Sequence, residues 1–230
     1  DTEKVIKYLI KKLNLESVYV NSDYTPYSIE RDSKIQKICK SLKCEFKESD
    51  DILLNSLEYP KKDDGTYYMT FTKYADKARM KKPLKPNYLN IESKLIEIKE
   101  KLKFNIPLEK LKDFYEFNPN NNVEGGRKQA KLILKNILNQ KNYNEKRSLC
   151  NYKSTNLSAY IKFGLVSIRE VYYTFLNNLG PQNDLVKQLY WREFYYYLLF
   201  HFPNTYLKKE GLKSTYKTFL WSYDKNKFNK

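Results

Sequence analysis

The chain has 230 residues, a length that can bury the core of one large domain or two small ones. Its residues are 41% hydrophobic and 16% aromatic, a composition that excludes a disordered chain. No apolar run approaches 18 residues and there is no signal peptide, so no membrane association is predicted. The formal net charge of +16 excludes an acidic protein and indicates either a polyanionic partner or a lysine-rich surface.

The first 57 residues alternate between helix and strand patterns. Residues 3–14 carry apolar side chains at helical spacing, and "SVYV" at 17–20 is a β-branched run typical of a buried strand. A helix is predicted to begin near Pro26, and "CEFKES" at 44–49 is a second candidate strand. This order predicts a partial, Rossmann-like α/β domain with a parallel sheet over residues 1–57.

Residues 58–123 have the composition of a connection. "YPKKDDGT" is rich in turn residues, and "MKKPLKPNY" contains two prolines. A connection of this length is uncommon inside a compact unit, so it is predicted to link two domains.

Residues 124–230 are predicted to form an all-α domain. Helices are expected in "GGRKQAKLILKNILNQ", in "STNLSAYIKFG" and after "SIRE", where Ser167 and Glu170 have the form of a capping box. "LGP" predicts the end of that helix, and "QLYWREFYYYLLFHFP" at 188–203 predicts the next one. This half carries +12 of the net charge and residues 1–123 carry +4, so the basic field belongs to the helical half.

Charged and amide groups stand in the middle of the aromatic helix at 188–203. One broad helical face carries Gln188, Trp191, Arg192 and Tyr195. The opposite positions, expected to pack or pair internally, include Leu189, Glu193 and Tyr197. Because an unpaired buried charge is costly, Arg192 either pairs with a protein carboxylate or serves a bound cofactor or substrate. Trp191 beside an amide is an arrangement that can stack on a base and hydrogen-bond to it.

Two further segments of the basic half carry groups suited to a phosphate. "KSTNLSAY" gathers the hydroxyls of Ser154, Thr155 and Ser158 at a helix start, which predicts either plain N-capping or a phosphate site. "YNEKR" places Tyr143 and Arg147 four residues apart on one helical face.

Several familiar sites are absent from the sequence. There is no GxGxxG, Walker A loop or GxSxG. The single histidine, His201, nearly excludes His-based metal sites and triads and is expected to be a packed or interfacial residue and not a catalyst. Three cysteines without a CxxC indicate a reducing, intracellular compartment, with cytoplasm or nucleus left open.

A series of motifs, in order along the chain, resembles the cryptochrome/photolyase family. "VNSDYTPYSIERD" resembles the strand and turn of the antenna domain, "GGRKQA" the start of the helical domain, and "STNLSAYIKFG" the TSxLSPYLxFG segment. "SIREVYY" follows, and "QLYWREFYYYL" with "HFPN" is similar to the most recognisable helix of the family. The resemblance spans essentially the whole chain and implies an α/β antenna-type domain followed by an all-α FAD-binding domain, both partial.

The resemblance implies a role for each candidate residue. It implies an FAD site that comprises Tyr143, Ser154, Thr155, Asn156, Leu157, Ser158, Arg192 and Tyr195. It implies contact of Arg147 with DNA phosphate, and of Gln188 and Trp191 with a lesion flipped out of UV-damaged DNA. Trp221 stands where the family often has the outermost tryptophan of a photoreduction chain. The implied chemistry is electron donation from excited, reduced FAD to a pyrimidine dimer; an antenna chromophore of unknown identity is compatible with it, and no metal is implied.

The sequence departs from the family pattern at both ends and at Gln188. The WFRxDLRxxDN-like opening strand and the WxxGxTGxPxVDAxMRxL-like segment are absent. We therefore expect a truncated chain that binds FAD weakly or not at all unless a separate chain supplies the missing C-terminal half. Photolyases for cyclobutane dimers usually carry Glu where this chain has Gln188, so "QLxWREF" favours the (6-4) photolyase and animal-cryptochrome branch, with lesion type left open.

Three functions stay open on the sequence. The first is a photolyase-like flavoprotein, or a fragment of one, that repairs UV-induced pyrimidine dimers. The second is a cryptochrome-type blue-light photoreceptor, or an inactive truncated remnant. The third is a helical nucleic-acid-binding protein without a cofactor. The charge of +12 on the helical half favours DNA contact over a photoreceptor role.

Overall fold

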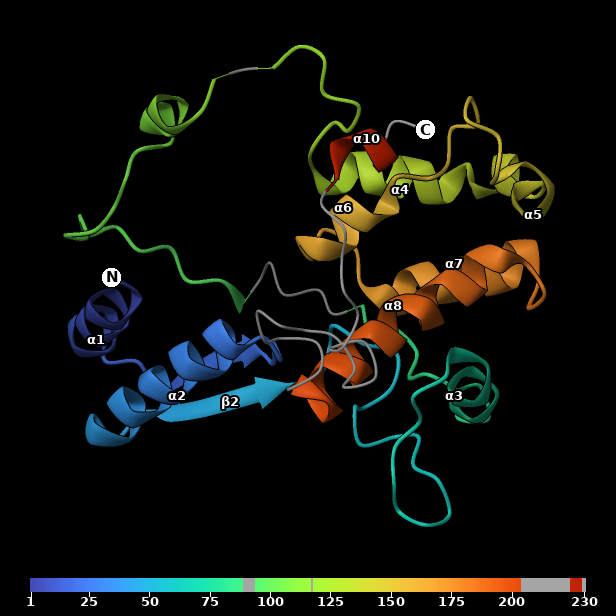
Figure 1. The fold of residues 1–230 in the computed structure, drawn as a ribbon. Coiled ribbons are helices and arrows are strands. Elements are labelled where there is room, and N and C mark those ends of the chain that lie inside the picture. Colours follow the sequence, from blue (N-terminus) through green and yellow to red (C-terminus); the bar gives the residue numbers. More distant parts are fainter. Residues whose placement is uncertain (89–93, 117, 204–223, 229–230) are drawn as a thin grey trace.

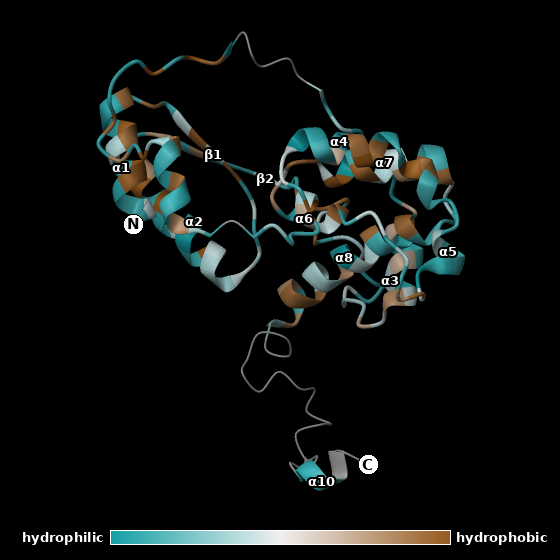
Figure 2. Ribbon diagram, turned by 90° about the horizontal axis from the view of Figure 1, so that it is seen from above, coloured by the Kyte–Doolittle hydropathy of each residue, from teal (hydrophilic) through white to brown (hydrophobic). Residues whose placement is uncertain are grey.

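The computed structural model describes residues 1–88, 94–116, 118–203 and 224–228. The chain forms an α/β unit and a helical unit, which lie on opposite sides in Figures 1 and 2. In the long connection between α3 and α4, residues 84–88 lie beside both units, next to Asn21 and Arg169, whereas residues 94–116 run along the outside of the α/β unit (Figure 1). The direct route between the units is the short segment that follows β2.

The α/β unit is a single crossover unit preceded by a helix. In chain order it comprises α1 (Thr2–Leu13), β1 (Ser17–Asn21), α2 (Pro26–Ser41) and β2 (Glu45–Ser49). The two strands pair in parallel, with Ser17 opposite Glu45. The hydroxyl of Thr25 caps α2 by accepting a hydrogen bond from the Ser28 amide at 3.4 Å, and Pro26 occupies the first turn. The predicted helices, strands and parallel pairing are confirmed.

The sheet is more exposed than the sequence predicted. A small core of buried side chains, packed between the helices and the sheet, consists of Ile10, Ile35, Cys39 and Cys44. Val18 packs against this core, whereas Tyr19, the next residue of β1, is 68% exposed. Successive residues of a strand point to opposite faces, and the second face is not covered by α1 or α2. The prediction of a buried strand at 17–20 was therefore wrong.

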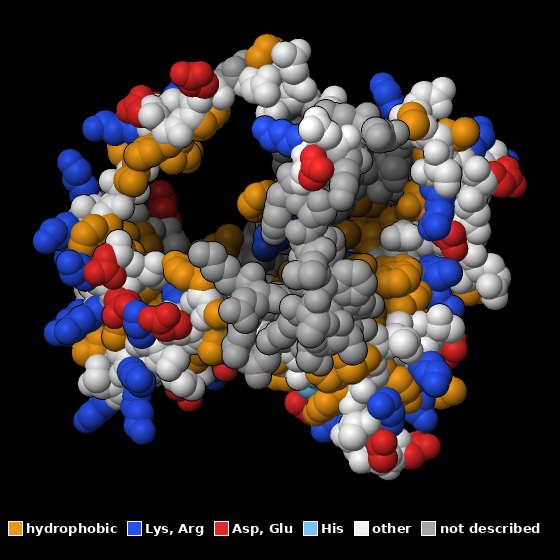
Figure 3. All heavy atoms as spheres, in the orientation of Figure 1, with side chains coloured by type: hydrophobic (Ala, Val, Ile, Leu, Met, Phe, Trp, Pro, Cys, Tyr) orange, Lys and Arg blue, Asp and Glu red, His pale blue; other side chains and the backbone are white. Residues whose placement is uncertain are grey.

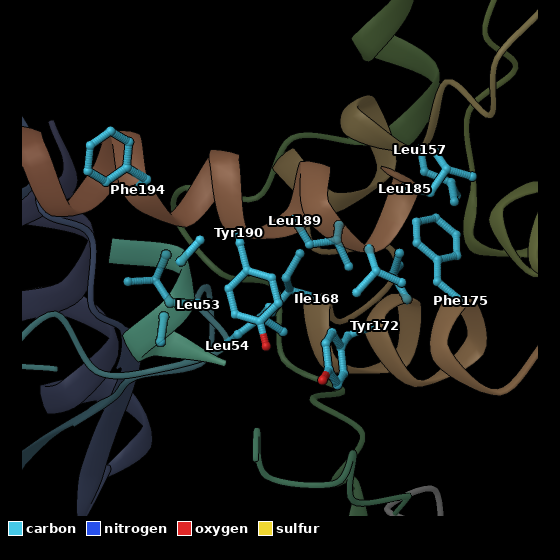
Figure 4. Close-up of a cluster of buried hydrophobic side chains, with 14 of the residues drawn as sticks. Leu53, Leu54, Leu157, Ile168, Tyr172, Phe175, Leu185, Leu189, Tyr190 and Phe194 are labelled. Atoms are coloured by element: carbon cyan, nitrogen blue, oxygen red, sulfur yellow. The ribbon is translucent and has the colours of Figure 1, made fainter. Parts of the chain in front are cut away.

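The helical unit contains most of the buried side chains. Its elements are α3 (Phe71–Ala78), α4 (Arg127–Lys135), the 3₁₀ helix η3 (Ile137–Gln140), α5 (Tyr143–Lys146), α6 (Leu157–Lys162), α7 (Ile168–Leu179) and α8 (Asp184–His201). Two short helices lie outside this unit: the 3₁₀ helix η2 (Leu108–Phe114) belongs to the long connection and has no buried residue, and α10 (Lys225–Phe228) stands apart from the other helices in Figure 2. Figure 4 shows Leu189 and Tyr190 of α8 directed toward the side chains of Leu53, Leu54 and Ile168. Full burial of an aliphatic or aromatic side chain contributes about 1.5–3 kcal/mol, so α8 is the centre of this core.

The expected boundaries of the connection differ from the packing. Leu53, Leu54 and Leu57 were assigned to the first domain, yet they belong to the core of the helical unit. Helix α3 lies within residues 58–123 and buries Tyr74 and Ala78 in the same core. Its apolar residues do have helical spacing, but turn-rich and proline-containing segments on both sides concealed this short helix. The segment from residue 53 to the end of α3 thus packs with the helical unit.

The ends of α7 follow the sequence pattern only in part. The hydroxyl of Ser167 accepts a hydrogen bond from the Arg169 amide at 3.2 Å, rather than from the amide of residue 170. The carboxylate of Glu170 does not reach back to the cap, because it pairs with Arg127 at 3.3 Å. The predicted capping box is therefore a single serine cap. Gly180, with a φ of 83°, ends the helix as "LGP" predicted.

A buried carboxylate joins α8 to the chain that follows β2. Glu193 is 2% exposed. Its Oε2 accepts hydrogen bonds from the amides of Leu54 and Asn55 at 2.6 and 2.9 Å, and its Oε1 accepts from Asn55 Nδ2 at 3.1 Å and from the Tyr74 hydroxyl at 2.9 Å. Burial raises the pKa of Glu193, and these hydrogen bonds oppose the rise. The predicted internal pairing of this residue is confirmed.

Replacing this carboxylate by an amide should destabilise the protein. In Glu193→Gln the amide nitrogen cannot accept, so at least two buried donors lose their acceptor, at a cost of about 2–4 kcal/mol. Urea unfolding followed by circular dichroism measures this free energy. Glu145→Gln, on an exposed position of α5, is the matched control and should change it by less than about 0.5 kcal/mol. Equal effects of the two substitutions would contradict the importance of the buried acceptor.

Candidate functional site

A pocket of about 290 Å³ lies between α5, the segment before α6, and helices α6, α7 and α8. Its walls consist of Tyr143, Ser154, Thr155, Asn156, Leu157, Ser158, Ile161, Phe175, Leu185, Gln188, Leu189 and Arg192. Candidate residues from three separate sequence segments, at 143, 154–158 and 188–192, therefore meet at one place. Nothing in their spacing along the chain required this.

The first turn of α6 and the segment before it supply hydroxyl groups of two kinds. The Thr155 hydroxyl accepts a hydrogen bond from the Leu157 amide at 3.3 Å, so this residue is a helix cap. Asn156 adopts a left-handed conformation, with a φ of 52°, which turns the chain into α6. Ser154 and Ser158 are exposed and, within the described ranges, have no protein partner for their hydroxyls. Those two hydroxyls are free to bind a ligand. Helix α6 has six residues, so its dipole adds little.

Arg192 is held by a backbone carbonyl and not by an acid. Its Nη1 donates to the Ile52 oxygen at 2.6 Å, and its guanidinium lies 4.9 Å from the centre of the Tyr196 ring. In the part of the chain that the structure describes, no carboxylate lies within ion-pair distance of it. Burial lowers the pKa of Arg192, although a guanidinium stays protonated in proteins. The pocket wall therefore carries a positive charge whose remaining donors can meet an anion.

The apolar walls were largely missed by the sequence reasoning. They include Ile161, Phe175, Leu185 and Leu189. On α8, residues 185, 188, 189 and 192 follow the spacing i, i+3, i+4 and i+7, a signal that could have found two of them. Leu189 was expected on the opposite face from Gln188 and instead lines the pocket beside it.

Trp191 and Tyr195 do not line this pocket. The Trp191 ring stacks on Phe71, with ring centres 3.6 Å apart and planes 8° apart. Tyr195 stacks less closely on Trp191, at 5.8 Å, and is 61% exposed. The broad face predicted for α8 is thus divided, with Gln188 and Arg192 toward the pocket and the two aromatic residues toward α3. Tyr195 therefore does not line this pocket with Gln188 and Arg192, because a helical face this wide meets two neighbours; its contact with FAD stays a prediction.

Arg147 lies at the end of α5 and pairs with Asp184, the first residue of α8, at 3.1 Å. The sequence reasoning identified this arginine but not its acidic partner. Trp221, the candidate for electron transfer, lies outside the described residues.

His201 is a packed residue, as predicted. Its ring stacks on Tyr67 with centres 3.4 Å apart, and its Nε2 lies 2.7 Å from the Leu57 oxygen. Burial lowers the pKa of His201. Among the described residues there is no cluster of metal-ligating side chains, and none of the helices is long and apolar enough to cross a membrane.

The face drawn in Figure 3 bears Lys and Arg side chains over both the α/β unit and the helical unit. Lys and Arg side chains are therefore not confined to the helical half. That half has the higher net charge because acidic side chains offset the cations of the first unit. Charge alone does not locate a site on this molecule.

Comparison with known proteins identifies the kind of fold. Residues 1–89 match the family model of DNA photolyase. The deoxyribodipyrimidine photo-lyases of Synechococcus sp. and Alkalihalophilus pseudofirmus are each 25% identical to this chain, over 96% and 92% of its length. The matches cover 49% and 45% of those proteins, so the chain spans about half the length of the curated relatives it matches.

Solved structures share this likeness over nearly the whole chain. The photolyase of Sulfolobus tokodaii, a structure with two FAD molecules, is 25% identical with a TM-score of 0.74, over 99% of this chain and 47% of that one. A cryptochrome from Synechocystis sp. has the same kind of fold, with a TM-score of 0.77 at 20% identity over 99% of this chain and 50% of that one. The predicted fold class, an α/β domain followed by a helical domain, is confirmed.

The stacking of Trp191 on Phe71 can be tested by fluorescence. The chain has two tryptophans, so Trp221→Phe leaves Trp191 as the only emitter. In that background, Phe71→Ala should shift the emission to longer wavelength and increase quenching by acrylamide, because one face of the indole loses its cover. Phe163→Ala, at an exposed residue outside the ring contacts, is the control. Unchanged emission in a folded Phe71→Ala variant would contradict the stacked arrangement.

Proposed function

Because the chain belongs to the photolyase/cryptochrome family, we propose that the pocket between α6 and α8 is part of the FAD site of a light-driven DNA-repair photolyase. The observation that supports this most directly is the convergence of Tyr143, residues 154–158, Gln188 and Arg192 on one pocket. The photolyase from Sulfolobus tokodaii, which this chain resembles, contains FAD.

The residues of the pocket suit one part of such a dinucleotide. Ser154 and Ser158 offer hydroxyl donors, and Arg192 offers a cation for a phosphate or for the polar edge of a flavin. At about 290 Å³ the pocket is at the lower limit of small-molecule sites, roughly 300–1,000 Å³, so it would enclose part of FAD and not all of it. We therefore propose that residues 1–230 bind FAD weakly by themselves and more tightly together with the C-terminal half that the relatives have.

The bound FAD would supply the photochemistry, namely donation of an electron from its excited reduced state to the damaged pyrimidines. The chain's own residues would bind and orient. Leu185 and Leu189 exclude water from the pocket, and Arg192 fixes an anionic or polar group of the ligand. The Gln188 amide can donate to and accept from an extruded base.

The proposed DNA contacts lie around the same pocket. Arg147, at the end of α5, would bind a phosphate near the lesion. Trp191 would meet the extruded base only with the part of its ring that Phe71 leaves uncovered. Gln188, where photolyases for cyclobutane dimers usually carry Glu, supports a (6-4) lesion as the substrate. The charge of +12 on residues 124–230 supports DNA over a purely signalling role.

The flavin assignment makes Arg192 the residue to test. Arg192→Met should weaken FAD binding at least about tenfold, because a charge-assisted hydrogen bond contributes about 1.5–3 kcal/mol. Titration of FAD fluorescence measures the affinity. Arg79→Met is the matched control, because Arg79 also lies over a tyrosine ring but outside the pocket. Equal FAD affinity of the two variants would contradict the assignment of this pocket to the FAD site.

Repair under blue light separates the candidate functions. Oligonucleotides with a cyclobutane dimer or a (6-4) lesion are illuminated with the chain alone and with the C-terminal half of the Synechococcus relative added. Repair of the (6-4) lesion with the added half is the expected result. FAD binding without repair of either lesion would favour a photoreceptor or an inactive remnant. Salt-sensitive DNA binding without flavin would favour a cofactor-free nucleic-acid-binding protein.

A further inference from the structure

The strongest feature outside the pocket walls is the ion pair between Arg147 and Asp184. Arg147 Nη1 lies 3.1 Å from Asp184 Oδ2, and the two side chains are 42% and 25% exposed. Surface pairs of this kind contribute about 0–1 kcal/mol to stability, so stability alone gives little reason to place an acid here. The position of the pair suggests another role.

The two elements that carry the pair are fixed independently of it. The Asp184 amide donates to Asn144 Oδ1 at 2.7 Å, and Asn144 Nδ2 donates to the Gln182 oxygen at 3.3 Å. These two hydrogen bonds hold α5 against the start of α8. Asp184 is also the first residue of an 18-residue helix, where the helix dipole stabilises a negative charge. The acid and the arginine therefore face each other without any ligand.

The pair stands at the edge of the pocket. Tyr143, four residues before Arg147, lines the pocket from α5, and Leu185, next to Asp184, lines it from α8. A phosphate that approaches Arg147 along this edge must meet the Asp184 carboxylate, which repels it and already occupies one of the guanidinium donors. The neighbouring cations Lys146 and Lys187 are exposed and have no such acidic partner in the described part of the chain.

We propose that Asp184 competes with DNA phosphate for Arg147 and so limits the binding of DNA that offers phosphate contacts alone, as undamaged DNA does. This inference rests on the proposed contact of Arg147 with DNA. Undamaged duplex binds through its phosphates alone and must displace the carboxylate without compensation. A lesion that enters the pocket adds base contacts that undamaged DNA lacks, so damaged DNA stays bound under conditions in which the weakened phosphate contacts no longer hold undamaged DNA.

The test measures binding of the full chain to an undamaged duplex by fluorescence anisotropy, at several salt concentrations. Asp184→Asn keeps the side-chain shape and removes the competing charge. It should raise the affinity at 0.1 M salt about threefold to tenfold and steepen the log–log salt dependence by about one unit, the value for one additional phosphate contact. Glu145→Gln is the matched control, since it also removes one negative charge, here from α5, at a residue that does not pair with Arg147.

Arg147→Gln distinguishes the inference from its premise. If Arg147→Gln weakens DNA binding but Asp184→Asn raises the DNA affinity no more than Glu145→Gln does, the proposed competition is overturned and the proposed contact of Arg147 with DNA stands. If Arg147→Gln leaves both affinity and salt dependence unchanged, Arg147 does not contact DNA and both are overturned. In the double variant Arg147→Gln with Asp184→Asn, the increase in DNA affinity caused by Asp184→Asn should fall to the increase caused by Glu145→Gln. Thermal unfolding of each variant shows that the fold is retained.

Discussion

The arrangement of this protein depends on the way α8 binds the backbone of the segment after β2. Arg192 donates to the Ile52 oxygen, Glu193 accepts from two amides of that segment, and Tyr197 donates to the Pro60 oxygen at 2.8 Å. An irregular segment buried against a helix has no ladder partner, so its amides and carbonyls need acceptors and donors from side chains. This requirement explains why charged groups stand in the middle of an aromatic helix.

The same contacts connect the two units of the fold to the pocket. Just after β2, Asp51 pairs with Arg169 of α7 at 2.7 Å, and residues 52–60 then follow α8. The segment thereby fixes α8 relative to both the sheet and α7, and the pocket is formed where the other side of α8 meets α7 and α6. A change at Glu193 is therefore expected to disturb the pocket as well as the core, although Glu193 does not line it.

The sequence predicted the parts of the fold that depend on local pattern. Helical spacing located α1, Pro26 located the start of α2, and "SIRE" and "LGP" located the two ends of α7. It failed where burial depends on distant packing. The β-branched run of β1 is exposed on the side that no helix covers, and α3 is stable because Tyr74 and its neighbours enter a core built more than 100 residues later in the chain. No window of a few residues contains that information.

The candidate site shows the same division between local pattern and distant contact. Periodicity placed Gln188 and Arg192 on one face, but the acceptor for Arg192 is a backbone carbonyl 140 residues away, which leaves no mark in side-chain identity. For the same reason Trp191 could not be separated from Arg192, since the ring that covers it belongs to α3. Helix α8 therefore divides its circumference among three partners: Glu193 and Tyr197 hold the segment after β2, Trp191 packs on α3, and Gln188 lines the pocket. Arg192 lies between the segment after β2 and the pocket. One of its nitrogens donates to the Ile52 oxygen, and the others can present the positive charge to a ligand.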